Sequence, residues 1–234
     1  MTVTDSDRRR SPKAAKTSSV FKKIVMAISG IIMVLFLIAH MIGNLHVFQG
    51  AKAFNSYSEW LRTVGEPALP YRTVLTIIEI VLTVSVIAHA WSAIALWRQA
   101  KRARPQSYVT KKSVAQTYAS RTMRWGGVIV GLFIVYHLLD LTFGVANPAG
   151  TDSTPYGRLV AGFSHPIPTI VYVIALIALG FHLRHGIWSA LQTLGRSSGP
   201  DQVRYKAIAL VFAVVLTAGF LAVPFAVQFG LVAR

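Results

Sequence analysis

The sequence predicts an all-α protein, an integral membrane bundle of five transmembrane helices. Of its 234 residues, 53% are hydrophobic and only 14% are charged, and the apolar residues are gathered in long blocks. About 20 consecutive apolar residues are enough to cross the hydrocarbon core of a bilayer. The polar stretches between the blocks are too short to form a separate soluble domain. The blocks cover about 23–48, 71–98, 122–144, 165–194 and 206–230.

The first block follows a polar, basic segment, residues 1–22, which we expect to be a cytoplasmic tail. The block itself is too long for the apolar region of a signal peptide, and no small-residue cleavage site closes it. We therefore expect it to be a retained helix, and residues 23–234 to form one membrane domain.

Between the first two blocks, apolar residues recur at the spacing of a helix. This predicts a short amphipathic helix that lies in the membrane interface and ends before Gly65 and Pro67. The remaining connections are rich in Pro, Gly, Ser and charge, as expected of loops. The apolar residues of the short helix are Phe54, Tyr57, Trp60 and Leu61.

The basic residues predict the orientation of the bundle. The formal charge is +16, and 18 of the 24 Lys and Arg residues lie in the tail, between the second and third blocks, or between the fourth and fifth. The positive-inside rule therefore places the N-terminus in the cytoplasm and the C-terminus outside. This distribution gives the charge a role in topology and in contact with lipid head groups, and it argues against a nucleic-acid partner. The absence of cysteine excludes disulfides and thiolate-bound zinc or iron–sulfur clusters in this chain.

Four histidines lie inside the first four apolar blocks, one on each: His40, His89, His137 and His182. An ionisable residue inside a membrane is costly without a partner, so it is a candidate functional residue. With a rise of about 1.5 Å per residue, His40 and His137 lie about 10–12 Å below the outer end of their helices. His89 and His182 lie about 24–27 Å below it. The sequence therefore predicts two facing pairs at two depths.

Two metal centres, each a haem with two histidine ligands, are the interpretation that this arrangement favours. Helix bundles hold cofactors between side chains of facing helices, and a difference in depth of about 12–15 Å accommodates one haem above another. Two imidazoles fill both axial positions of the iron, which confines a haem to electron transfer. The alternative is that each histidine is a hydrogen-bonded core residue, but four histidines matched in depth argue against it.

Three further histidines have weaker assignments. His46 lies near the interface on another helix face, and His165 begins the fourth helix beside Pro166. His185 lies one turn beyond His182 and competes with it as a ligand. It is also a candidate contact for a haem propionate or a quinone carbonyl. His182 is preferred as the ligand because its depth matches His89 better.

Three carboxylates and one arginine complete the candidate site residues. Glu79 and Asp140 lie near the depth of the outer histidine pair, and a buried carboxylate can carry protons. With Glu66 they indicate a quinone site on the outer side, while a site at the inner surface is the alternative. A structural hydrogen bond, or an Asp140 that faces water, is the other interpretation of these carboxylates. Arg184 either neutralises a propionate or extends to the inner surface.

Four segments occur in order along the chain: SGIIMVLFLIAHMIGNLHVF followed by GAKAFNSY, then IAHAWSAI, GLFIVYHLLDLTFG and GFHLRHGIWSALQTLG. In this order they resemble the cytochrome b subunit of succinate dehydrogenase and fumarate reductase, in its single-chain, five-helix, two-haem form. The resemblance extends over about 24–230 and is strongest in the last segment, residues 180–195.

The resemblance implies a function and a set of partners. The ligands of two b haems fall on His40, His89, His137 and His182, the set reached from depth. The chain is then the quinone-reactive electron-transfer subunit of succinate:quinone oxidoreductase (respiratory complex II), in the bacterial cytoplasmic membrane and without a succinate site of its own. A flavoprotein and an iron–sulfur subunit dock on the cytoplasmic side, and the complex is expected to be a trimer. Electrons pass through the inner haem and then the outer haem to a quinone, usually menaquinone. Some members carry a glutamate linked to proton transfer where this chain has Gly180, which weighs against such a route here.

Other functions stay open. Haem-b subunits of formate dehydrogenase, nitrate reductase or hydrogenase also carry intramembrane histidines, but usually not one on each of four successive helices. A small transporter or proton channel often has broken helices or an inverted repeat, and we find neither in the sequence. An anchor with one haem or none is the remaining alternative.

Overall fold

The computed structural model describes residues 18–103, 118–193 and 201–232, and within these ranges every regular element is helical. Five helices are long and apolar enough to cross a membrane, which confirms the predicted all-α membrane bundle. Seven α-helices are present in the described ranges, with a 3-10 turn (η1) and a π-helical turn (η2). The five long helices are α1 (Ser19–Leu45), α3 (Thr73–Arg102), α4 (Tyr118–His137), α6 (Pro166–Thr193) and α7 (Asp201–Gln228).

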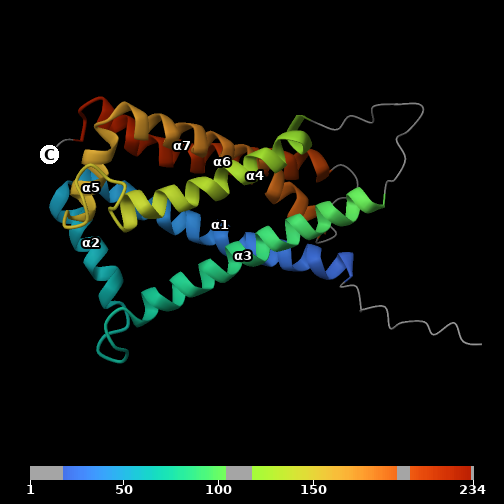
Figure 1. The fold of residues 1–234 in the computed structure, drawn as a ribbon, viewed down its shortest axis with the longest axis horizontal. Helices are drawn as coiled ribbons and strands as arrows, with labels where there is room; N and C mark the ends of the chain where they lie inside the picture. Colours follow the sequence, from blue (N-terminus) through green and yellow to red (C-terminus); the bar gives the residue numbers. More distant parts are fainter. Residues whose placement is uncertain (1–17, 104–117, 194–200, 233–234) are drawn as a thin grey trace, which may run out of the picture.

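The two ends of the bundle differ in structure and charge. At one end, the cap end, the short helices α2 (Ala51–Thr63) and α5 (Pro155–Phe163) lie across the ends of the long helices (Figure 1). The opposite end, the basic end, is where α1, α4 and α7 begin and α3 and α6 end. Among the residues whose side chains the structure describes, the basic ones near these helix ends are Lys22, Lys23, Arg98, Lys101, Arg102, Arg124, Arg204 and Lys206.

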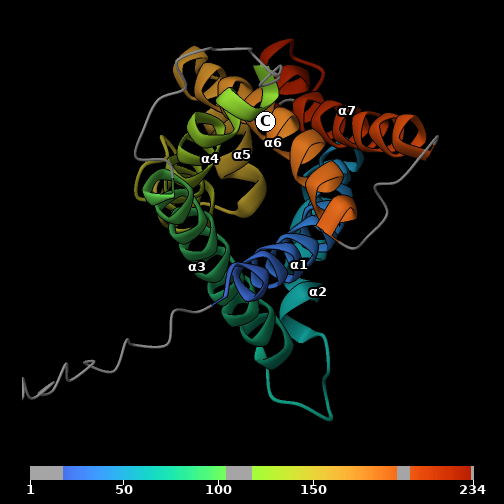
Figure 2. The ribbon, with the colours of Figure 1, turned by 90° about the vertical axis from the view of Figure 1, so that its right-hand side faces the viewer.

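The long helices pack in two groups. Helix α1 packs along α3, whereas α4 packs along α6 and α6 along α7. Helix α1 also contacts α7 and α6, and these contacts join the groups. Viewed along the bundle, α1 and α3 cross on one side, and α4, α6 and α7 lie on the other (Figure 2). Large apolar side chains such as Leu35, Ile87, Leu132, Ile167 and Val211 are exposed, which is the surface expected of helices that face lipid.

The best-buried apolar core lies at the cap end. There η1 (His46–Gln49) packs on α2, α2 packs on α5, and α5 packs against α6 and α7. This end of the bundle is therefore closed by protein, because short helices cover it. The buried residues of the cluster are Val47, Phe54, Tyr156, Leu159, Val160, Phe163, Tyr172, Val223, Ala226, Val227 and Val232.

Helix α1 begins earlier than the sequence indicated. The backbone N–H of Phe21 donates to the Ser18 hydroxyl at 3.1 Å, so Ser18 is an N-cap and residues 19–22 of the expected tail form the first turn. Residues 1–17 of that tail lie outside the described residues. Sequence reasoning started the helix at the first apolar run and overlooked the capping serine.

Of the two short helices, one was predicted from the sequence and the other was not. The short helix predicted between the first two apolar blocks is confirmed as α2. Helix α5 was not predicted, because its segment was assigned to a loop rich in Gly and Pro. Its start does carry a recognisable signal: Thr154 accepts a hydrogen bond from the Gly157 N–H at 3.1 Å, and Pro155 follows at the first helical position.

The third transmembrane segment does not stay α-helical to its end. Directly after His137 the backbone widens into the π-helical turn η2 (Leu138–Thr142). Such single π turns are frequent at functional sites, since the extra residue redirects the side chains of one turn. Here the turn places Asp140, which is 1% exposed, toward the interior of the cap end.

Candidate functional site

The structure brings the four intramembrane histidines together in the two pairs expected from their depths. His40 on α1 and His137 on α4 have ring centres 5.8 Å apart, with the ring planes at 88°. His89 on α3 and His182 on α6 have ring centres 6.1 Å apart, with the planes at 63°. We call these the cap-end pair and the basic-end pair. The role of the four residues as ligands stays a prediction.

Each pair joins one helix group to the other. His40 and His89 belong to the α1/α3 group, whereas His137 and His182 belong to the α4/α6/α7 group. A group bound between two paired imidazoles would therefore connect parts of the bundle that have few other contacts. This is the way helix bundles hold metal cofactors, from side chains on facing helices.

The spacing within each pair fits a metal with two axial imidazoles. With a metal–imidazole bond of about 2 Å on each side and about 1.1 Å from a ring nitrogen to the ring centre, two such rings have centres about 6 Å apart. The observed separations of 5.8 and 6.1 Å agree with this value. Within the described ranges, no three His, Cys, Asp or Glu side chains gather into a metal site. A pair suits haem, because the porphyrin supplies the remaining ligands of the iron.

Glycines lie beside the basic-end pair. A Cβ atom added at Gly30 on α1 would be 3.5 Å from Cε1 of His89, and one added at Gly127 on α4 would be 3.7 Å from Cε1 of His182. Each histidine ring therefore has backbone beside it where another residue would present a side chain. A side chain larger than a methyl group at either position would press against the imidazole ring.

The Nδ1 atom of His89 has two acceptors. It lies 3.1 Å from the Met26 carbonyl and 3.4 Å from the Ser29 hydroxyl, and that hydroxyl itself donates to the Val25 carbonyl at 2.7 Å. Since a carbonyl can only accept, the proton of His89 belongs on Nδ1. Nε2 is then unprotonated, as it must be to bind a metal.

The Nδ1 atom of His137 contacts a chain of polar residues. It lies 3.3 Å from the Tyr172 hydroxyl, which donates to Oδ2 of Asp140 at 2.9 Å. The Asn147 amide donates to the other carboxylate oxygen, Oδ1, at 2.7 Å. Asp140, Tyr172 and Asn147 are all buried. The carboxylate is thus satisfied by neutral donors, inside the apolar cap end.

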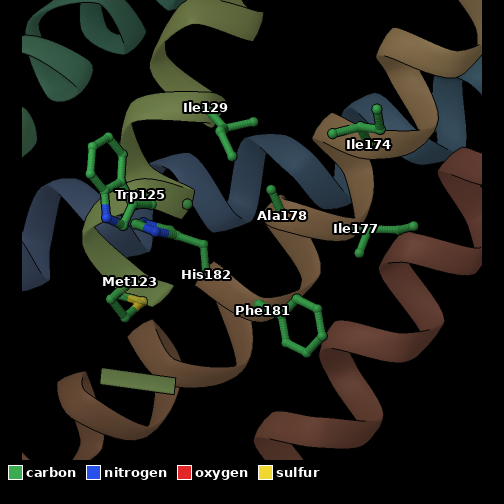
Figure 3. A pocket seen from close by; sticks show the side chains of 9 residues that line it. Met123, Trp125, Ile129, Ile174, Ile177, Ala178, Phe181 and His182 are labelled. Carbon is green, nitrogen blue, oxygen red and sulfur yellow. The ribbon is translucent and has the colours of Figure 1, made fainter. Parts of the chain in front are cut away.

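His182 differs from these two residues. Its Nδ1 atom is buried and has no hydrogen-bond partner in the described part of the chain, which leaves a costly unsatisfied polar atom. His182 also lines an apolar groove of about 220 Å³ between α4 and α6, shown in Figure 3 with Trp125 and Ile129 from α4 and Ala178 and Phe181 from α6. An unsatisfied ring nitrogen in such surroundings is free to bind a metal or a polar group.

The other predicted site residues are more dispersed. Asp140 is linked to His137 through Tyr172, whereas Glu79 is half exposed and pairs with Arg72 at 3.2 Å. The expected route through Glu79 and Asp140 together is therefore not formed by contact between them. Glu66 and Arg184 are exposed, and His185 is partly buried beside His182 on α6.

The two histidines expected at the interface lie at the cap end. His46 begins η1 and stacks on Tyr57 of α2, with ring centres 4.4 Å apart. His165 is exposed and immediately precedes α6. Both thus lie at the opposite end of the bundle from the basic-end pair.

Sequence reasoning missed Tyr172, Asn147 and Ser29. The hydroxyl of Tyr172 within the apolar stretch PIPTIVYVIALIALG indicates a polar contact, because a buried tyrosine usually finds a hydrogen-bond partner. Its partner, Asp140, lies on another helix and far away in the sequence. Asn147 comes from a loop. Neither contact can be read from the spacing along one helix.

Comparison with known proteins agrees with the helical membrane fold. Residues 98–222 match the model of the family described as succinate dehydrogenase/fumarate reductase transmembrane subunit. The succinate dehydrogenase cytochrome b558 subunit of Bacillus subtilis (strain 168) is 25% identical over 184 residues, covering 78% of this chain and 84% of that protein. No solved structure matches the chain. Because the family model spans more than half of the chain, from the end of α3 into α7, this multi-pass membrane protein belongs to the succinate dehydrogenase/fumarate reductase transmembrane subunit family.

Proposed function

We propose that this chain is the dihaem cytochrome b membrane anchor of a succinate:quinone oxidoreductase, respiratory complex II. Its four intramembrane histidines hold two b haems, His40 with His137 and His89 with His182. The observation that carries the proposal is the pairing itself: two sets of facing imidazoles with ring centres 5.8 and 6.1 Å apart. Membership of the family and the printed name of the Bacillus relative, a cytochrome b558 subunit, support it.

The chemistry follows from the type of ligand. A bound b haem would supply one-electron chemistry, and with an imidazole from each member of a pair its iron would have no position left for dioxygen or substrate. The chain's residues fix the orientation of the imidazoles: the Met26 carbonyl holds His89, and the Tyr172 hydroxyl holds His137. The chain conducts electrons and reacts with quinone, while succinate binds to a partner subunit.

The partners are a flavoprotein and an iron–sulfur subunit, docked at the basic end on the cytoplasmic side. Lys and Arg side chains surround the helix ends there, as the positive-inside rule requires of a cytoplasmic face. Electrons from succinate enter near His89 and His182 and leave for a quinone, menaquinone in this proposal, from the region of His40 and His137. The carboxylates Glu66, Glu79 and Asp140 stay the proposed proton or quinone contacts, and the complex is proposed to be a trimer.

The proposal is tested on the purified complex by haem quantification and a reduced-minus-oxidised spectrum. The wild type is expected to contain two low-spin b haems per chain. His40→Ala or His137→Ala removes one, and His89→Ala or His182→Ala removes the other. His46→Ala and His165→Ala are matched controls and keep both, and His185→Ala tests the competing ligand. A complex that assembles without haem, or four variants that all retain two haems, would contradict the proposal.

A further inference from the structure

A buried chain of hydrogen bonds connects the cap-end pair to a carboxylate. From His137 it runs through the Tyr172 hydroxyl to Asp140 and ends at Asn147, with distances of 3.3, 2.9 and 2.7 Å. Tyr172, Asp140 and Asn147 are 4%, 1% and 8% exposed. Water therefore has little access to compete for these bonds.

All the hydrogen bonds in this series donate toward the Asp140 carboxylate. Both oxygens of Asp140 accept, Oδ1 from the Asn147 amide and Oδ2 from the Tyr172 hydroxyl. A hydroxyl has one proton, so a tyrosine that donates to the carboxylate has only lone pairs to offer His137. The Nδ1 atom of His137 must then carry a proton and donate it. Nε2 is left unprotonated for a metal.

The surroundings hold Tyr172 in one position. The rings of Phe133 and Phe163 meet the tyrosine ring edge-on, with centres 4.9 and 4.8 Å away and planes at 90° and 89°. Asn147 is anchored in turn, since its amide also donates to the Arg158 carbonyl at 3.0 Å. The hydroxyl therefore has little freedom to leave the histidine.

In the part of the chain that the structure describes, the basic-end pair has no carboxylate linked to it in this way. The Nδ1 atom of His89 faces the neutral Met26 carbonyl and the Ser29 hydroxyl. An acceptor connected to a carboxylate draws the Nδ1 proton more strongly than a neutral one, and this makes the ring a better electron donor to a bound metal. The two histidine pairs therefore differ in how strongly their rings donate electrons to a bound metal.

We propose that Tyr172 is a positioning residue that fixes the His137 ring and, through its bond to Asp140, lowers the reduction potential of a haem bound at the cap-end pair. A more basic ligand stabilises the ferric state, and second-shell hydrogen bonding is one of the means by which a protein sets haem potential. The inference rests on the proposed function, because it requires a haem at this pair.

The test is a redox titration of both haems in the full complex carrying Tyr172→Phe. This variant keeps the ring and its packing and removes only the hydroxyl. We expect both haems to be retained, the potential of one to shift upward, and the potential of the other to stay at the wild-type value. Tyr136→Phe is the matched control, because the Tyr136 ring packs against Tyr172 at 5.9 Å but lies outside this chain of hydrogen bonds.

The outcomes separate the two proposals. A wild-type complex without haem overturns the proposed function. Two haems with unchanged potentials in Tyr172→Phe overturn this inference and leave the proposed function intact. If Tyr172→Phe loses the haem, Asp140→Asn decides, since it removes the charge and leaves the tyrosine in place. An upward shift of one potential in that variant supports the inference, and no shift overturns it.

Discussion

The ring planes of His40 and His137 stand at 88° to each other, with their centres 5.8 Å apart, although the residues come from different helix groups. His40 also stacks on Phe36, with ring centres 5.1 Å apart, and His137 contacts Phe133 at 5.8 Å. Each imidazole is thus held by an aromatic residue one turn earlier on its own helix. These contacts restrict the orientation of the rings, and a restricted orientation lowers the entropy cost of binding a group between them.

Gly127 packs its backbone against the ring of His182 in the basic-end pair. Leucine at this position extends from a Cβ that is already 3.7 Å from the His182 ring, so its branched end would crowd that ring and displace it from its pairing with His89. We expect Gly127→Leu to lose one haem per chain and retain the other, measured by haem quantification. Gly131→Leu is the control, because a Cβ there meets nothing within 4 Å. Loss of the same haem in both variants would show that the effect is not local.

Binding of haem is expected to stabilise the assembled bundle strongly. Both histidine pairs bridge the α1/α3 group and the α4/α6/α7 group, so a ligand bound by a pair stabilises the folded arrangement by mass action. This stabilisation is about 4 kcal/mol when the free ligand concentration is about 1,000 times the dissociation constant. Complex purified from haem-depleted cells should unfold at a lower temperature than complex loaded with haem. Equal unfolding temperatures would contradict a bridging role of the ligand.

The fold was largely predictable because the membrane imposes its own length and polarity on each helix. Blocks of apolar residues gave the five long helices to within a few residues, and the rise per residue gave the histidine pairs. Both inferences need only the position of a residue along its own helix, measured from the membrane surface that all the helices share. His40 and His137 meet for this reason, although nothing in the sequence between them indicates it.

The cap end was much less predictable, since its structure depends on loops and on contacts between distant segments. Asp140 was placed near the depth of the outer histidine pair, with a structural hydrogen bond or contact with water as the other interpretation. Its link to Tyr172 needs the π-helical turn η2, which has no clear sequence signal. Glu79 was expected at the same depth, yet it faces outward and pairs with Arg72. Depth alone does not specify on which side of a helix a residue lies.

Gly219 allows α7 to approach α1 closely. A Cβ at this position would collide with the Met41 side chain, so an added methyl group requires a shift of that chain or of the helices. We expect Gly219→Ala to destabilise the protein by about 1–3 kcal/mol, the cost typical of overpacking, and to lower its thermal unfolding midpoint. Gly131→Ala is the matched control: it meets no neighbour, and the better helix propensity of alanine makes it neutral or stabilising by up to about 1 kcal/mol. Equal effects of the two changes would exclude close packing as the cause.

The proposed orientation can be tested with introduced thiols, because the chain has no cysteine of its own. Thr151 lies in an exposed loop at the cap end, and Ala103 is exposed at the end of α3, at the basic end. If the basic end faces the cytoplasm, a membrane-impermeant maleimide should label Thr151→Cys in intact cells and label Ala103→Cys only after the membrane is opened. The cysteine-free protein gives the background in both conditions. The reverse pattern would place the basic end outside and would exclude docking of cytoplasmic partner subunits there.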